Sequence, residues 1–285
     1  MNWIPQPTHD GSFTFFSEEF GEAFHSTQGA KAEALSKFAQ ATDLAQQADR
    51  GQICLLDVCY GLGYNSAAAI ETIWQANPNC KITLFGLEQD PSVPIAAIDL
   101  LGDWSISVQS ALRQIAQAHS YQSDRLAATL LVGDARQTIR SLQIQADAIF
   151  FDPFSPRRCP QLWTVEFFGQ VARCLAPTGK LATYSRSASV RSAMRAAGLS
   201  IGTIPLGDGH LPHEWSQGTV AAYTEKGLHP LSKMEQEHLQ TRAAVPYRDP
   251  NLNDKSEKIL QRHQQEQQRS TLESTSSWRR RWQIH

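Results

Sequence analysis

Short apolar runs alternate with amphipathic segments through the middle of the chain. The runs at residues 53–58, 81–87, 127–132 and 146–151 have the length of buried strands, and apolar positions between them recur at helical spacing. Such runs are typical of strands covered on both faces, as in a parallel sheet flanked by helices. Further strands are predicted at 180–184, 201–204 and 219–223, and helices at 30–48, 65–74, 93–101, 106–118, 135–142, 164–175 and 189–197.

Repeated strand–helix units predict an α/β fold, in which a Rossmann-like, mostly parallel seven-stranded sheet has helices on both faces. The strands at 201–204 and 219–223 are expected to pair with each other. The helix at 164–175 is expected to end at Pro177-Thr178-Gly179. We divide the chain into an N-terminal, partly helical extension (1–50), a central domain (51–225) and a basic, polar tail (226–285). The tail is expected to be partly helical or disordered.

Composition narrows the class of protein. The apolar content of 41% supports a sizeable core, and no apolar stretch is long enough to span a membrane. The N-terminus lacks the order of basic and apolar residues found in a secretory signal. Five cysteines without CxxC spacing favour reduced thiols in a cytoplasmic protein over disulfides or a metal site. The net charge is −6 over residues 1–225 and +4 over 226–285, so the tail is compatible with a polyanionic partner, and a merely solvated tail is the alternative.

The first candidate site is the loop after the strand at 53–58, which reads Asp57-Val58-Cys59-Tyr60-Gly61-Leu62-Gly63-Tyr64-Asn65. Glycines at a strand-to-helix turn allow the backbone to approach a ligand, and the following helix start favours negative groups. Loops that bind S-adenosylmethionine (SAM) commonly read acid-x-Gly-x-Gly-x-Gly, and Cys59 replaces the first glycine here. A purely structural turn is the alternative.

Two more acids follow predicted strands. Glu88 ends the second strand, where an acid in nucleotide-binding α/β folds accepts hydrogen bonds from the ribose hydroxyls. Asp134 follows the third strand and is placed to accept a hydrogen bond from the adenine amine. The alternatives are a surface acid at position 88 and a helix N-cap at position 134.

The most informative motif is Asp152-Pro153-Phe154-Ser155-Pro156, which follows the largely apolar run Ala146 to Phe151. In open α/β sheets, ligands bind at the carboxyl ends of the strands. A carboxylate there can take a proton from an amine, or orient it, so that the lone pair faces a methyl donor. Phe154 can stack on a base. The alternative is a turn in which Asp152 caps the next helix.

Together these blocks resemble the bacterial tRNA 5-methylaminomethyl-2-thiouridine methyltransferases over roughly residues 8–205. The most specific are the Asp152 motif, the block that follows it through Thr164, and Ala182-Thr183-Tyr184-Ser185. The resemblance also uses Asp10-Gly11-Ser12 with Thr14, His25-Ser26 with Gly29-Ala30 and Glu33, the glycine loop, Gly179-Lys180-Leu181, and Val190-Arg191 with Ala196-Ala197-Gly198.

The resemblance implies a class I methyltransferase fold, SAM as donor, and the amine of 5-aminomethyl-2-thiouridine in tRNA as acceptor, without a membrane or a metal. It implies that residues 1–50 help to close the site and that the oxidase half found in bifunctional relatives is absent. The implied SAM-binding residues are Asp57, Gly61, Gly63, Asn65, Glu88 and Asp134. Asp152 is the implied catalytic acid, and Phe154, Ser155, His25, Glu33 and Tyr184 are implied on the substrate side.

Two features depart from the family pattern. Cys59 and Tyr60 are unusual in the glycine loop, and residues 207–215 replace the usual ending of the catalytic domain. They leave two alternatives: a SAM-dependent methyltransferase of another amine or small metabolite, and a non-catalytic RNA-binding relative. In the tail, Trp278-Arg279-Arg280-Arg281-Trp282 is a candidate RNA contact by phosphate pairing and stacking, with a solvated or helix-docking tail as the alternative.

Overall fold

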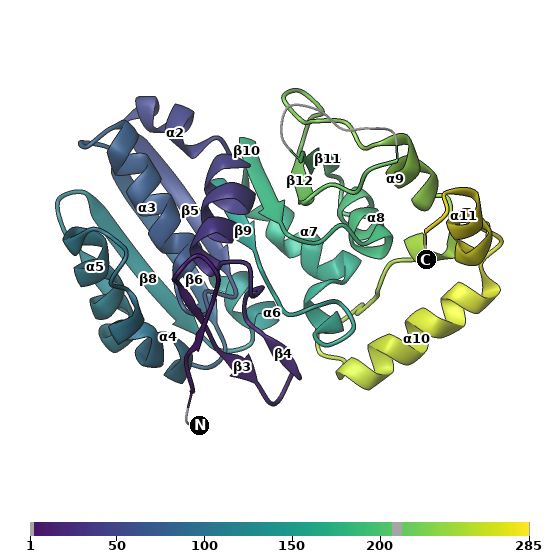
Figure 1. The fold of residues 1–285 in the computed structure, drawn as a ribbon, viewed down its shortest axis with the longest axis horizontal. Helices are drawn as coiled ribbons and strands as arrows, with labels where there is room; N and C mark the ends of the chain where they lie inside the picture. The colour runs from purple at the N-terminus through teal and green to yellow at the C-terminus, as the bar shows by residue number, and fades with distance from the viewer. Residues whose placement is uncertain (1–2, 207–212, 285) are drawn as a thin grey trace.

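An eight-stranded sheet forms the centre of the computed structural model, which describes residues 3–206 and 213–284 (Figure 1). The strand order is β11-β12-β10-β9-β5-β6-β8-β7, and all neighbours from β10 to β8 run parallel. Strands β12 and β7 run antiparallel to their neighbours. The strands are β5 (Gln52–Val58), β6 (Lys81–Glu88), β7 (Ser120–Gln122), β8 (Leu126–Val132), β9 (Ala146–Phe151), β10 (Leu175–Thr183), β11 (Ser200–Ile204) and β12 (Gly218–Ala222).

The direction of chain progression reverses between β5 and β9. From β5 the chain moves outward through β6 to β8, and it then returns to β9 on the other side of β5. The carboxyl ends of these two central strands are level, because Val58 pairs with Phe151. A reversal of this kind opens a crevice in which α/β proteins bind ligands.

Two layers of helices cover the sheet. One apolar core lies under α1, η1, α2, α3, α4 and α5, and a second lies under α6, α7 and α8. The first layer comprises α1 (Ala30–Glu33), the π-helical η1 (Ala34–Gln40), α2 (Leu44–Gln47), α3 (Tyr64–Ala76), α4 (Ser92–Ala97) and α5 (Ile106–Ala118). The second comprises α6 (Ala135–Thr138), α7 (Val165–Arg173) and α8 (Ala188–Ala196). The predicted α/β fold, a mostly parallel sheet with helices on both faces, is therefore confirmed.

The structure differs from the predicted elements in three places. Strand β7 adds an eighth strand, which is too short to leave a hydrophobic pattern. The segment predicted as one helix at 30–48 is divided at Asp43, whose φ of 57° is left-handed. Pro177-Thr178-Gly179 was expected to end the helix before it, but α7 already ends at Arg173 and the segment lies inside β10, where the register with β9 shifts. A Cβ at Gly179 would lie 2.5 Å from the carbonyl oxygen of Ala146, so the bulge requires glycine.

The N-terminal segment folds over the carboxyl end of the sheet. It contains two small antiparallel pairs, β1 (Gln6–Pro7) with β2 (Phe13–Thr14), and β3 (Phe16–Ser17) with β4 (Glu22–Ala23). Its aromatic rings pack on each other, with Trp3 stacked on Phe15 at 5.7 Å and Phe24 edge-on to Trp3 at 5.5 Å. A layer of rings thereby covers the crevice between β5 and β9.

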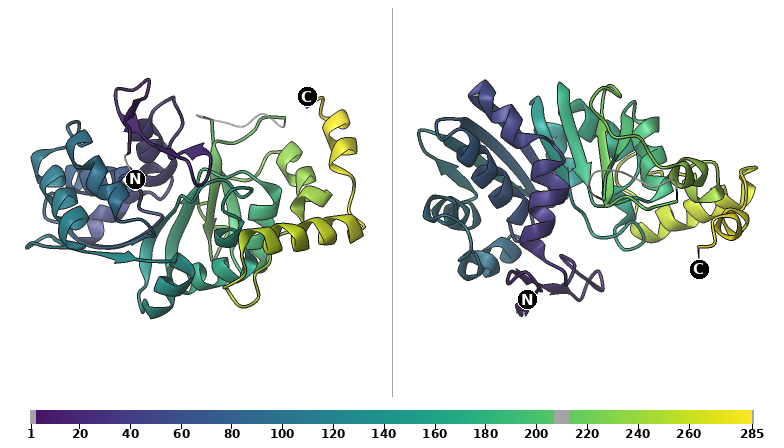
Figure 2. Two further views of the ribbon diagram at one scale, coloured as in Figure 1. Left: turned by 90° about the horizontal axis from the view of Figure 1, so that it is seen from below. Right: turned by 45° about the horizontal axis from the view of Figure 1, so that its top comes forward.

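The C-terminal helices α9 (Lys233–His238), α10 (Ser256–Arg269) and α11 (Thr275–Arg281) lie at the end of the molecule farthest from α3 and α5 (Figures 1 and 2). Trp278 is buried against His238, with ring centroids 4.2 Å apart. The Trp282 ring nitrogen donates to Glu237, and Arg281 pairs with Glu237 and Glu273. The helix-docking alternative therefore describes Trp278, whose ring is buried.

Candidate active site

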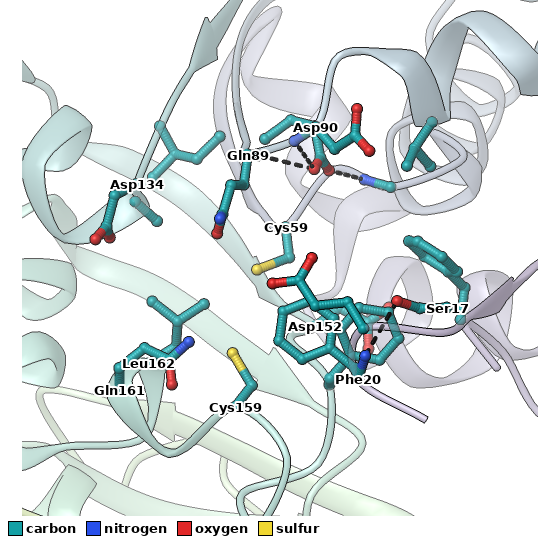
Figure 3. Close-up of a pocket in the computed structure, with 18 of the residues that line it drawn as sticks. Ser17, Phe20, Cys59, Gln89, Asp90, Asp134, Asp152, Cys159, Gln161 and Leu162 are labelled. Atoms are coloured by element: carbon teal, nitrogen blue, oxygen red, sulfur yellow. Dashed lines mark hydrogen bonds between the residues drawn. The ribbon is translucent and has the colours of Figure 1, made fainter. Parts of the chain in front are cut away.

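A cavity lies at the carboxyl ends of β5, β6, β8 and β9, under the N-terminal aromatic layer (Figure 3). Five of the predicted site residues line it: Gly61, Glu88, Asp134, Asp152 and Phe154. The Asp152 carboxyl group and the Cys59 thiol point into the space between them, with Asp134 and Gln161 on the opposite side (Figure 3). The cavity therefore joins the predicted cofactor loops to the predicted catalytic acid.

The glycine loop has left-handed backbone at three positions. The φ angles are 70° at Cys59, 55° at Gly61 and 85° at Gly63. A Cβ at Gly63 would lie 2.9 Å from the Tyr60 hydroxyl oxygen, so this position tolerates only glycine without rearrangement. Cys59 stands where SAM-binding loops usually have glycine, and its backbone has the left-handed conformation that glycine adopts easily. Its Cβ makes this conformation sterically less favourable. Its thiol is directed into the cavity (Figure 3).

Glu88 connects the glycine loop to the loop after β6. Its Oε2 accepts the Gly61 amide at 2.7 Å, and its Oε1 accepts the amides of Gln89 and Asp90 at 2.8 and 2.9 Å. Burial raises the pKa of this carboxyl group, and the three amides oppose that effect. Glu88 lines the cavity and fixes the conformation of both loops through these three bonds. A carboxylate has further lone pairs that can accept hydrogen bonds from a ligand's hydroxyl groups.

Asp152 follows β9 and is held by the first turn of α3. The Asn65 side-chain amide donates to its Oδ2 at 2.8 Å. Burial, and then the negative charge of Glu33, raise the pKa of Asp152 to about 8. A carboxyl group with this pKa is poised to exchange a proton near neutral pH.

Asp57 and Asn65 lie behind the loop rather than on the cavity wall. Asp57 accepts from the Ser66 hydroxyl at 2.6 Å, and burial raises its pKa to about 7. Among the residues that the structure describes, Asp57 Oδ1 and Asn65 Oδ1 are buried without a hydrogen-bond partner. Neither residue contacts the cavity, so both support the glycine loop from behind.

Asp134 both caps a helix and faces the cavity. Its Oδ1 accepts the Arg136 amide at 2.9 Å, which makes it the N-cap of α6. Its carboxylate also pairs with the Arg136 guanidinium at 2.7 Å. The two predicted alternatives, N-cap and cavity residue, are therefore compatible in one side chain.

Phe154 is packed between two rings of the N-terminal segment. Phe20 stacks on it at 4.4 Å, and Phe24 meets it edge-on at 4.9 Å. The Ser155 amide donates to Glu22 at 2.9 Å, and the Tyr184 hydroxyl donates to the carbonyl of Pro153 at 2.8 Å. Ser155 and Tyr184 support the loop that carries Asp152 and Phe154, and neither lines the cavity.

His25 and Glu33 also lie outside the cavity wall. His25 is bonded through its backbone amide to Thr14 at 2.9 Å and packs edge-on against Tyr64 at 5.3 Å. Burial lowers the pKa of its imidazole to about 4, so the ring is neutral at physiological pH. Glu33 pairs with Lys37 one helical turn away and is near enough to raise the pKa of Asp152.

Several wall residues were not predicted from the sequence. They are Trp3, Phe20 and Phe24 from the N-terminal segment, and Arg136 and Gln161 from the sheet's loops. Of these, only Arg136 and Gln161 lie in motifs that the sequence analysis had singled out. Arg136 is two residues after Asp134, and Gln161 belongs to the block that ends at Thr164. In residues 3–206 and 213–284, no group of three or more His, Cys, Asp or Glu side chains is arranged to hold a metal ion. Over the same ranges, no helix is long and apolar enough to cross a bilayer.

The fold and this site define a class I SAM-dependent methyltransferase. A family model described as S-adenosyl-L-methionine-dependent methyltransferase matches residues 101–207. The left-handed Gly61 on the wall and the carboxylate of Glu88, which bridges two loops, fit SAM, whose ribose supplies hydroxyl groups.

The chain is similar to the methyltransferase part of proteins named MnmC. The crystal structure of MnmC2 from Aquifex aeolicus superposes with a TM-score of 0.81, at 29% identity, covering 94% of this chain and 86% of that one. The tRNA 5-methylaminomethyl-2-thiouridine biosynthesis bifunctional protein MnmC of Pseudomonas savastanoi is 29% identical over 237 residues, which are 75% of this chain. This chain spans about a third of that relative's length. An uncharacterized protein of Methanocaldococcus jannaschii is 27% identical over 266 residues, covering 89% of this chain and 69% of the relative. The resemblance to the MnmC methyltransferase family is thereby confirmed.

Proposed function

We propose that this chain methylates the primary amine of 5-aminomethyl-2-thiouridine at the wobble position of tRNA. The observation that carries the proposal is the position of Asp152, which shares one cavity with Gly61 and Glu88 and is tied to the glycine loop through Asn65. The name of the Pseudomonas savastanoi relative supplies tRNA and the methylated nucleoside, 5-methylaminomethyl-2-thiouridine.

The raised pKa of Asp152 suits an amine acceptor. SAM supplies a methyl group on a sulfonium, which the amine nitrogen attacks as the carbon–sulfur bond breaks. The nitrogen needs its lone pair, whereas an alkylammonium keeps its proton up to a pKa of about 10.4. A carboxylate of ordinary acidity is more than about six pKa units weaker as a base than that amine. With a pKa of about 8, Asp152 narrows the gap to about two units, so it can hold the proton while the amine reacts.

The neighbouring residues take supporting roles in this proposal. Phe154 forms the wall against which the uracil ring packs, and Tyr184 and Ser155 fix the loop that carries it. Glu33 keeps the pKa of Asp152 high, and the neutral His25 packs behind α3. Asp57, Gly63, Asn65 and Glu88 shape the SAM loop, and Asp134 faces the adenine.

The test is the Asp152→Asn variant with tRNA from a strain lacking its wobble-uridine methyltransferase. We expect a fall in kcat of at least ~100-fold, the usual loss for a general base, with a SAM dissociation constant within about threefold of the parent protein. Asp99→Asn, at an exposed side chain, is the matched control and should be fully active. Nucleoside mass spectrometry identifies the acceptor.

Two outcomes would overturn the proposal. Near-normal turnover by Asp152→Asn would remove the assigned role of the carboxylate. A parent protein that binds SAM but adds no methyl group to 5-aminomethyl-2-thiouridine would assign the site to another amine or small metabolite.

A further inference from the structure

Arg136 joins the cofactor cavity to the C-terminal part of the chain. Its Nε and Nη2 donate to the Asp134 carboxylate at 3.1 and 2.7 Å. Its Nη1 donates to Asp249 Oδ2 and to the carbonyl oxygen of Asp254, both at 2.9 Å. One guanidinium, itself on the cavity wall, therefore bridges a cavity acid and a segment 113 residues later.

Asp249 is held in place by several contacts besides its ion pair with Arg136. Its side chain is fully buried, and its Oδ1 accepts the amides of Asn253 and Asp254 at 3.2 and 3.1 Å. Its own amide donates to Glu166 at 2.7 Å. The turn that it closes includes Leu252, whose φ of 55° is left-handed for a branched side chain. A buried carboxylate is unfavourable unless it is paired, so the turn and the ion pair depend on each other.

The same segment supports a second wall residue. The Ser256 hydroxyl, at the first residue of α10, donates to the Gln161 side-chain oxygen at 2.8 Å. Gln161 and Asp134 lie on the same side of the cavity, facing Asp152 across it (Figure 3). Residues 249–256, which we name the bracing segment, thus hold two polar groups on the wall assigned to the adenine end of SAM.

We propose that the bracing segment sets the affinity for SAM, with Asp249 as a positioning residue that acts through Arg136. Without the Asp249 carboxylate, Arg136 keeps its bonds to Asp134 and to the Asp254 carbonyl but loses its buried ion pair, so the guanidinium holds Asp134 less firmly at the wall. Binding is reciprocal, so SAM in turn stabilises the bracing segment. Cofactor binding and docking of the C-terminal helices are one coupled equilibrium.

The test is direct binding of SAM and of S-adenosylhomocysteine by calorimetry, with no acceptor present. For Asp249→Asn, which keeps the side-chain size and an acceptor for the turn, we expect about tenfold weaker binding of both ligands. Ser256→Ala removes the bond to Gln161 alone and should weaken binding by about threefold. Glu273→Gln is the control, because it breaks an exposed ion pair of α11 away from the cavity, and its affinity should be unchanged.

Hydrogen exchange separates a positioning role from a general loss of stability. In the parent protein, S-adenosylhomocysteine should slow amide exchange across residues 249–256, and Asp249→Asn should lose that protection while keeping it at the glycine loop. Parent-like affinity in a folded Asp249→Asn variant, or no protection of residues 249–256 in the parent protein, would overturn the proposal. If Asp249→Asn does not fold, parent-like affinity of Ser256→Ala has the same meaning. A failure of the tRNA assay leaves this inference intact, because the binding experiment contains no RNA.

Discussion

Asn65 donates its side-chain amide to Asp152 across 2.8 Å, and this bond ties the first turn of α3 to the loop after β9. The residue that follows the glycine loop therefore orients the proposed catalytic acid. A change in the loop is transmitted to the carboxylate without any ligand between them.

The bond makes the pH profile a test of Asn65. It lowers the pKa of Asp152, against the larger effect of burial. The parent kcat/KM should rise with pH to about 8, where Asp152 ionises, and level off above that pH, because the neutral amine is the reactive form. Asn65→Ala should move the lower limb to higher pH, by about half a unit or more. An unchanged limb in this variant would show that Asn65 does not act on Asp152.

Asp152 should also lower the stability of the fold at alkaline pH. Its folded pKa of about 8 lies above the ordinary value of 3.8, so the folded state retains a proton that the unfolded state has lost between these pH values. The contribution of Asp152 to stability is therefore complete below about pH 4 and is lost as the pH rises to about 8. We expect Asp152→Asn, which cannot ionise, to be more stable than the parent at pH 8.5 by ~2 kcal/mol or more, and to lose this advantage at pH 5. Urea unfolding at both pH values measures it, and equal differences at the two would contradict the assigned pKa.

Cys59 offers a test of backbone strain in the cofactor loop. Its φ of 70° is left-handed, so Cys59→Gly should raise the free energy of unfolding relative to Cys59→Ala by ~1 kcal/mol. The alanine variant loses the same thiol and keeps the Cβ, which makes it the matched control. Equal stability of the two variants would show that the loop relaxes around a side chain at this position.

A substitution at Glu88 should weaken the binding of SAM and leave the binding of the methyl acceptor unchanged. Glu88→Gln replaces one of the two carboxylate oxygens with an amide donor, so either the Gly61 amide or the Gln89 and Asp90 amides lose their acceptor, and one acceptor fewer is left for the proposed ribose contact. We expect the SAM dissociation constant to rise about tenfold, and the KM for tRNA to stay within about twofold. Glu71→Gln, on the outer face of α3, is the control. A SAM affinity equal to that of the parent would refute ribose recognition by Glu88.

The sequence predicted those residues of the candidate site that lie at the end of a strand or in the loop directly after it. Strand β9 was predicted with its observed bounds, Ala146–Phe151, because five of its six residues are apolar and the run leads directly into the motif of Asp152. The Gly61 loop, Glu88 and Asp134 were found by the same logic, since each ends a buried run. Parallel register then brings these residues to one edge of the sheet, as the observed strand order shows.

The parts that could not be predicted depend on contacts between distant segments. Nothing near Asp249 marks it as a partner of Arg136, because the surrounding tail has the polar composition of a solvated segment. The bulge at Gly179 was missed for a related reason. Proline and glycine indicate a turn in a local reading, whereas the close carbonyl of Ala146 that makes glycine necessary comes from the neighbouring strand.

Phe20 occupies one face of the Phe154 ring, nearly parallel to it, at an interplanar angle of 18°. A nucleobase that stacks on this face has to exchange places with Phe20. Phe20 lies in the turn between β3 and β4, so the exchange displaces the hairpin as a whole. The Phe20 ring thus occupies the place of a stacked base, and under the proposed function the wobble nucleotide reaches Phe154 only when Phe20 moves away from it.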